Sequence, residues 1–210
     1  MAWLVLLSVA ILSFIIGFLV KFVDFIEDDL KLSVKLSKTN LKTKGKSSKL
    51  VFLKKISFPL GILYGLLIAF VLFIWPILFP LAIGTILGEV VARKIDVVGH
   101  FIALFIFVLL CAFLISLGLL NIGLNLYFVA LALVFLAASL IDEYFDKYGE
   151  KAKGKYAYFS FFSFRPFLEI TAFFVSLVSN EWIIWITILA FDLAYVLSTK
   201  FLPKVFFKLK

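Results

Sequence analysis

The chain has 210 residues, of which 64% are hydrophobic and 16% are charged, and its formal net charge is +8. This composition excludes an ordinary soluble domain, whose core has no room for 27 phenylalanines. The positive charge does not call for nucleic acid as a partner, because basic loops that face an anionic membrane leaflet explain it more simply. We therefore expect an all-α, polytopic integral membrane protein.

Long apolar stretches predict about seven membrane-spanning helices. The second stretch, residues 56–92, is too long for one crossing at a rise of about 1.5 Å per residue. Pro76 and Pro80 divide it, because proline interrupts the hydrogen bonding of a helix. The predicted spans are 2–20, 56–75, 77–92, 97–118, 124–141, 166–180 and 182–200.

Two polar segments interrupt the spans. Residues 21–55 form a lysine-rich loop, in which Leu30–Ser37 alternates with the period of an extended segment and Thr39–Lys49 has the composition of a flexible linker. Residues 142–165 form the second loop. Because neither loop is large enough for a soluble domain, we expect residues 1–210 to form one transmembrane domain.

The basic residues predict the orientation of the helices. If the 21–55 loop is cytoplasmic, seven crossings place all 21 lysines and arginines on the cytoplasmic side, as the positive-inside rule prefers. The N-terminus is then outside and the C-terminus is cytoplasmic. The expected location is the cell membrane, with anionic lipid headgroups as partners of the basic loop, and the oligomeric state stays open.

Acidic residues collect at the predicted cytoplasmic ends of the spans. Several pairs are four residues apart and would share one face of a helix. Carboxylates that converge there favour Mg²⁺, which prefers oxygen ligands. The candidate metal ligands are Asp24, Asp28, Asp142, Glu143 and Asp146. The alternative is that these acids only neutralise nearby lysines.

The segment Asp142–Asp146, with the sequence DEYFD, resembles the acid-rich D-[DE]-x-x-D motif of isoprenoid diphosphate enzymes. In that family the acids hold Mg²⁺ on a diphosphate, so the resemblance implies a magnesium site here. It covers five residues, with a partial echo at Glu27–Asp29. The intramembrane prenyltransferases have longer chains, more spans and an Asn-Asp opening to their first motif, which this sequence lacks.

Other candidate site residues lie in or beside the spans. Glu89 and Asp192 fall within predicted spans, where a charge costs at least about 2–3 kcal/mol and suggests function. Asp96 and His100, the one histidine, are four residues apart. We expect catalytic roles for Glu89, Asp96, His100 and Asp192. Expected substrate-binding residues are Arg93, Arg165 and Glu169, with Arg165 suited to a phosphate.

The ionisable residues collect on the predicted cytoplasmic side, and this distribution favours a membrane-embedded enzyme at the cytoplasmic leaflet. It would act as a magnesium-dependent transferase or hydrolase on a phosphorylated or diphosphate lipid, either a polyprenyl lipid or a glycerolipid. The first alternative is a divalent-cation or proton-coupled transporter or channel that uses Glu89 and Asp192. The second is a structural protein that binds lipid through its lysine-rich loop.

Overall fold

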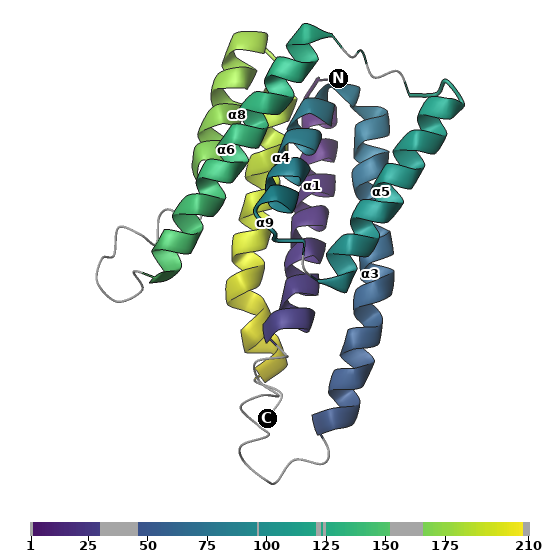
Figure 1. The fold of residues 1–210 in the computed structure, drawn as a ribbon, viewed down its shortest axis with the longest axis vertical. Helices are drawn as coiled ribbons and strands as arrows, with labels where there is room; N and C mark the ends of the chain where they lie inside the picture. Colours follow the sequence, from purple (N-terminus) through teal and green to yellow (C-terminus); the bar gives the residue numbers. More distant parts are fainter. Residues whose placement is uncertain are drawn as a thin grey trace.

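The protein is a bundle of α-helices in the computed structural model, and every regular element among the described residues is helical (Figure 1). The structure describes residues 2–29, 46–95, 97–120, 123, 125–151 and 166–207. The elements are α1 (Ala2–Asp24), a π-helical turn η1 (Phe25–Asp29), α3 (Lys46–Ile74), a 3₁₀ turn η2 (Pro76–Leu78), α4 (Phe79–Val91), α5 (Val98–Ser116), α6 (Leu126–Lys151), α8 (Pro166–Ser179) and α9 (Trp182–Phe207).

Five of these helices are long and apolar enough to cross a membrane. They are α1, α3, α5, α6 and α9, whereas α4 and α8 are shorter apolar helices. Large apolar side chains such as Trp3, Leu126 and Val178 are exposed on the outside of the bundle. A surface of this kind suits lipid better than water. The predicted all-α membrane bundle is therefore confirmed in its class, while seven crossings and their orientation stay predictions.

Proline divides the second apolar stretch as predicted. The helix α3 ends at Ile74, and Pro76 begins the short turn η2 before α4 starts at Phe79. A proline at the first turn of a helix loses no hydrogen bond, because its missing N–H would have no partner there. Pro80, the second predicted breaker, lies in the first turn of α4.

The helices extend further than the predicted spans. The segment 21–55 is not a continuous loop, because α1 and η1 reach Asp29 and α3 already begins at Lys46. The segment 142–165 is likewise helical as far as Lys151, where α6 ends. Hydropathy marks where a segment leaves apolar surroundings, but lysine and glutamate continue a helix readily beyond that point. The predicted extended segment Leu30–Ser37 lies outside the described residues.

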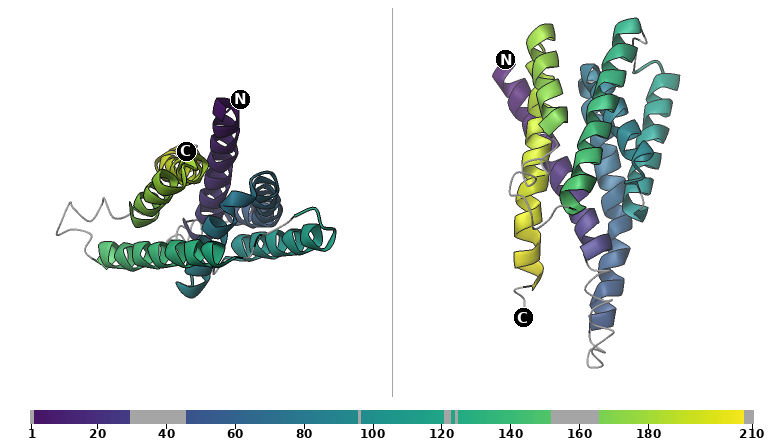
Figure 2. Two further views of the ribbon diagram at one scale, coloured as in Figure 1. Left: turned by 90° about the horizontal axis from the view of Figure 1, so that it is seen from above. Right: turned by 60° about the vertical axis from the view of Figure 1, so that its left-hand side comes forward.

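The bundle is built from three close helix pairs: α1 with α9, α3 with α5, and α4 with α6. In the view from above, α8 and α9 lie on one side of α1 and α3 lies on the other (Figure 2). Successive helices alternate in direction (Figure 1). The end of α1, the start of α5, the end of α6 and the start of α8 therefore share one end of the bundle.

Glycines allow all three of these pairs to approach closely, and Gly61 and Gly65 do so between α3 and α5. A Cβ atom at Gly84 would lie 2.5 Å from the backbone oxygen of Ala132, and one at Gly88 would overlap the side chain of Ser139. This G-x-x-x-G pattern therefore packs α4 against α6, which is its usual role between membrane helices. Gly17 has the same role between α1 and α9. The close contacts position α4 so that Glu89 lines the interior described next.

Candidate functional site: a cavity with an acid–histidine–tyrosine chain

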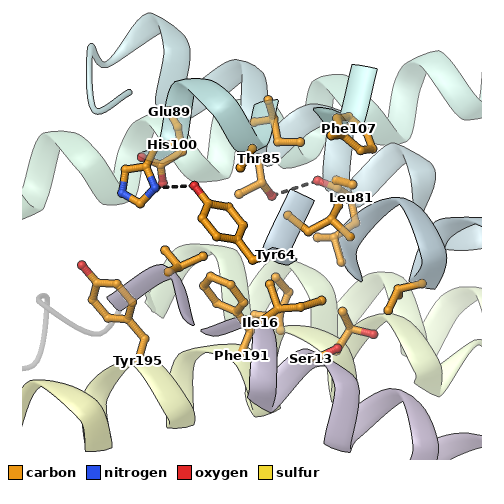
Figure 3. Close-up of a pocket in the computed structure, with 18 of the residues that line it drawn as sticks. Ser13, Ile16, Tyr64, Leu81, Thr85, Glu89, His100, Phe107, Phe191 and Tyr195 are labelled. Atoms are coloured by element: carbon orange, nitrogen blue, oxygen red, sulfur yellow. Dashed lines mark hydrogen bonds between the residues drawn. The ribbon is translucent and has the colours of Figure 1, made fainter. Parts of the chain in front are cut away.

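A cavity of about 280 Å³ lies between the helices, and Figure 3 shows residues that line it. Its walls come from α1, α3, α4, α5 and α9, with Leu168 of α8 and Lys94 also contributing. Most of the lining is aliphatic or aromatic, and its volume is near the lower limit of about 300 Å³ for small-molecule sites. The ionisable lining residues are Asp24, Glu89, Lys94, His100 and Asp192, and the tyrosines are Tyr64 and Tyr195.

His100 occupies the centre of a hydrogen-bonded chain at the polar end of this cavity. Its Nε2 lies 2.5 Å from Oδ1 of Asp24, and its Nδ1 lies 2.5 Å from the hydroxyl of Tyr64. Since a carboxylate can only accept, Nε2 carries a proton. In a neutral ring, Nδ1 then accepts the Tyr64 hydroxyl proton. The chain therefore connects a carboxylate to a phenol through an imidazole, with all three side chains facing the cavity.

Tyr195 completes the surroundings of Asp24. Its hydroxyl donates to the second carboxylate oxygen, Oδ2, at 2.9 Å. The ammonium group of Lys21 lies 5.0 Å from the centre of the Tyr195 ring, within the range of a cation–π interaction. Asp24 is therefore fixed from α5 and α9 at the same time, and its orientation toward His100 is well determined.

Glu27 holds the start of α5, where His100 is located. Its carboxylate accepts the backbone N–H groups of Val98 at 3.2 Å and Gly99 at 3.0 Å, and it also accepts the hydroxyl of Ser57. A carboxylate at a helix N-terminus satisfies N–H groups that have no partner within the helix and interacts favourably with the helix dipole. Glu27 therefore connects η1, α3 and α5 beside the histidine.

Asp142 holds a second helix in the same manner. It is 2% exposed, and its two oxygens accept the N–H groups of Phe167 at 3.0 Å and Leu168 at 2.7 Å, in the first turn of α8. The residue predicted as a metal ligand is thus occupied with a structural role, the anchoring of α8 to α6.

Lys94 pairs with the other two acids of α6. Its Nζ lies 3.0 Å from Glu143 and 3.1 Å from Asp146. Partial burial opposes the charged form of Lys94, but the charges and hydrogen bonds of Glu143 and Asp146 outweigh it and raise its pKa above 10.5. The lysine therefore stays charged at neutral pH and joins the α4–α5 connection to α6.

The predicted metal ligands are consequently distributed over separate contacts. Asp24 belongs to the histidine chain, Asp142 caps α8, and Glu143 and Asp146 pair with Lys94. Within the part of the chain that the structure describes, no three His, Cys, Asp or Glu side chains gather in a way that would hold a metal ion. The side chain of Asp28 lies outside that part. The predicted magnesium site therefore stays a prediction.

Three of the four predicted catalytic residues lie together in the structure. Glu89, His100 and Asp192 line the same cavity, with Asp192 7% exposed. Asp96 lies outside the described residues, and the described acid that contacts His100 is Asp24 of α1.

The predicted substrate-binding residues lie away from the histidine chain or beyond the described part. Arg93 is exposed and has a positive φ of 60° in the turn that follows α4. Glu169 is half-buried in the first turn of α8. Arg165 is outside the described residues, so its role in phosphate binding stays a prediction. The cavity's basic residue from this region is Lys94, next to Arg93 in the sequence.

Sequence reasoning missed Tyr64, Tyr195, Glu27 and Lys94. Two of them carried a local signal: Glu27 lies three residues after Asp24, and Tyr195 three residues after Asp192, so each pair was able to share a helix face. Tyr64 had no such signal, because its partner is 36 positions away in the sequence.

No protein-family model, curated protein or solved structure matches this chain. What the cavity is able to do follows from its own chemistry. An acid–histidine–tyrosine chain moves protons, and an apolar wall accommodates a hydrocarbon chain. Both properties occur in one cavity, within helices of membrane-spanning length.

Proposed function

We propose that the protein is a membrane-embedded enzyme that performs acid–base chemistry on the headgroup of a lipid. The observation that carries this proposal is the Asp24–His100–Tyr64 chain at the polar end of an otherwise apolar cavity. The hydrocarbon part of the lipid would lie along the aliphatic walls, and its headgroup would contact the hydrogen-bonded side chains of Asp24, His100 and Tyr64.

In the proposed step, the hydroxyl oxygen of Tyr64 takes a proton from the reacting group of the headgroup. Tyr64 gives its own proton to Nδ1 of His100, and Asp24 stabilises the imidazolium that forms. The reverse transfer returns the proton to the product. A positioned acid–base group of this kind contributes about 10²–10⁴-fold to a rate. The tyrosine is the group that touches the substrate, and Asp24 acts through the histidine.

The narrower form of the proposal is a phosphorylated or diphosphate lipid, bound at the cytoplasmic leaflet of the cell membrane by a protein with seven crossings. Lys94 is the lysine among the cavity-lining residues, and its ammonium group would turn from Glu143 and Asp146 toward such a headgroup. The carboxylates of Asp24, Glu89 and Asp192 would oppose an anion, so a phosphorylated substrate would enter with its own divalent cation. That cation belongs to the substrate, and no step above depends on it.

A lipid-turnover assay tests this proposal. The purified protein in lipid nanodiscs is incubated with a polyprenyl diphosphate, a phosphatidic acid or a neutral diacylglycerol, with and without Mg²⁺, and products are measured by mass spectrometry. We expect one of these lipids to be consumed, and Asp24→Asn and Tyr64→Phe each to lower kcat by about 10²-fold or more with a smaller change in KM.

Glu181→Gln is the matched control, because Glu181 is exposed in the turn between α8 and α9, at the opposite end of the bundle. Its turnover should equal that of the unmodified protein. If none of the lipids reacts, or if Asp24→Asn retains full turnover, the proposed function is wrong.

Cation or proton transport is the second candidate, because Glu89 of α4 and Asp192 of α9 line the same cavity. Two carboxylates within apolar helices are a frequent feature of ion pathways. Liposome flux of protons or Mg²⁺ that Asp192→Asn abolishes, together with no lipid turnover, would favour this candidate over the enzyme.

A further inference from the structure

The cavity is elongated along the bundle axis. On α1 it extends from Asp24 to Ser13, which at about 1.5 Å per residue corresponds to about 16 Å. On α3 it extends from Tyr64 to Leu72, or about 12 Å by the same measure. In Figure 3, Glu89, His100 and Tyr195 lie toward one side of the cavity, and Leu81, Phe107 and Ser13 toward the other.

Ser13 is a polar exception at the apolar end. It is 2% exposed and lines the cavity, yet its hydroxyl has no hydrogen-bond partner among the described residues. A buried hydroxyl without a partner is costly, so most such groups are satisfied. A hydrogen-bonding group from outside the protein would therefore stabilise the hydroxyl of Ser13.

The other aliphatic hydroxyls of the cavity differ from Ser13. Thr85 donates to the carbonyl of Leu81 at 2.8 Å, and Thr187 donates to the carbonyl of Ile183 at 2.7 Å, each one helical turn back. This back-bonding is the usual solution for a hydroxyl within a helix. The hydroxyl of Ser13 is instead available to the cavity.

We propose that Ser13 is a second polar anchor, which binds an oxygen carried by the ligand far from its headgroup. The ligand would be an amphiphile with a hydroxyl, ether or carbonyl oxygen about 16 Å along its chain. A plain hydrocarbon tail would leave Ser13 without a partner. This inference rests on the cavity of the proposed function, but it concerns binding and does not depend on the acid–base step.

A trapped water is the competing explanation. An ordered buried water commonly makes two to four hydrogen bonds to polar groups. Much of the cavity's lining is aliphatic and includes Val71, Leu72, Leu78 and Ile188, which offer no side-chain hydrogen bonds. A ligand oxygen needs only the one bond to Ser13, because the rest of its chain is held by the apolar walls.

Two probes of equal chain length separate these possibilities: dodecan-1-ol and dodecane-1,12-diol. Binding to the full-length protein in nanodiscs is measured by titration calorimetry and corrected for partition into empty nanodiscs. We expect the diol to bind about threefold to tenfold more tightly than the alcohol, which is the value of one neutral hydrogen bond. In Ser13→Ala the two probes should bind equally, with the affinity for the alcohol unchanged.

Ser198→Ala is the matched control. Ser198 is also buried, but it donates to the carbonyl of Ala194 at 2.6 Å and does not line the cavity, so its replacement should preserve the preference for the diol. Without ligand, Ser13→Ala should unfold at the same temperature as the unmodified protein or at a higher one, because it removes an unsatisfied hydroxyl.

Equal binding of both probes to the unmodified protein would overturn the proposal, and so would a diol preference that survives in Ser13→Ala. A clear destabilisation by Ser13→Ala alone would also overturn it, since Ser13 would then have a structural role. A preference for the diol without any lipid turnover would refute the proposed reaction but would still support Ser13 as a ligand-binding residue.

Discussion

Replacing Asp142 with alanine is expected to lower the free energy of unfolding by about 3 kcal/mol, because two backbone N–H groups lose their buried acceptor. For a chain of this length that corresponds to a melting temperature about 6–12 °C lower. The loss should be the same in EDTA and in Mg²⁺, since Asp142 stabilises α8 directly. Thermal unfolding in detergent, followed by circular dichroism, measures both quantities.

Asp146→Ala is the control for that experiment. Asp146 lies four residues further along α6, and its side chain is 34% exposed while it pairs with Lys94. An ion pair this exposed is worth at most about 1 kcal/mol, so the melting temperature should change little. A Mg²⁺-dependent stabilisation that only Asp142→Ala abolishes would contradict the capping role and restore the metal site expected from the sequence.

Replacing Glu27 with alanine should lower the free energy of unfolding by a similar amount, because Glu27 holds the start of α5 beside His100. Three hydrogen bonds are lost, two of them from the first turn of α5, and we expect about 2–4 kcal/mol of destabilisation. Hydrogen exchange should show faster exchange at the amides of Val98 and Gly99 than at amides in the middle of α5. The measurement is hydrogen exchange detected by NMR or mass spectrometry, combined with denaturant unfolding.

A double-mutant cycle with Ser57→Ala isolates the bond between Ser57 and Glu27. Because the two side chains are in contact, their effects should not add, and the coupling should be about 0.5–3 kcal/mol. Glu181→Ala, which removes an exposed acid, provides the baseline. Strictly additive effects of Glu27→Ala and Ser57→Ala, with unchanged exchange at Val98 and Gly99, would show that Glu27 does not hold α5.

The membrane-helix class was predictable because a bilayer imposes a length and an apolar composition on each span. The break at Pro76 was predictable for a covalent reason, the missing N–H of proline. The ends of the helices were not, because α1, α3 and α6 continue through charged residues that are good helix formers. Hydropathy locates the apolar part of a helix and not its last residue.

The candidate site was predictable only in part. The cost of placing an ionisable group in a span identified Glu89 and Asp192, and both line the cavity. Spacing of four residues suggested an Asp96–His100 pair, but Asp96 lies outside the described residues, and the described acid that contacts His100 comes from α1. Tyr195 reaches Asp24 across 171 positions of sequence. Contacts between distant helices depend on packing, which local spacing does not encode.

Asp142 also shows that local sequence does not reveal the contacts between distant helices. Its acid-rich surroundings resembled a motif, and its position at the end of an apolar stretch suggested a ligand for magnesium. Its environment is decided by α8, which begins at Pro166 and presents two N–H groups to it. Backbone N–H groups at a helix start are favourable partners for a carboxylate. An acid pattern in a sequence therefore predicts a site only once its neighbours are known.

The hydrogen-bonded chain through His100 is tested most directly by nitrogen NMR of its imidazole ring. The protein contains one histidine, so ring labelling with nitrogen-15 gives signals from this residue alone. We expect Nε2 to keep its proton in the neutral and the charged ring, while Nδ1 gains and loses one. Asp24→Asn should shift mainly the Nε2 signal, and Tyr64→Phe mainly the Nδ1 signal. Rapid exchange between both tautomers, insensitive to both replacements, would contradict the chain and the function built on it.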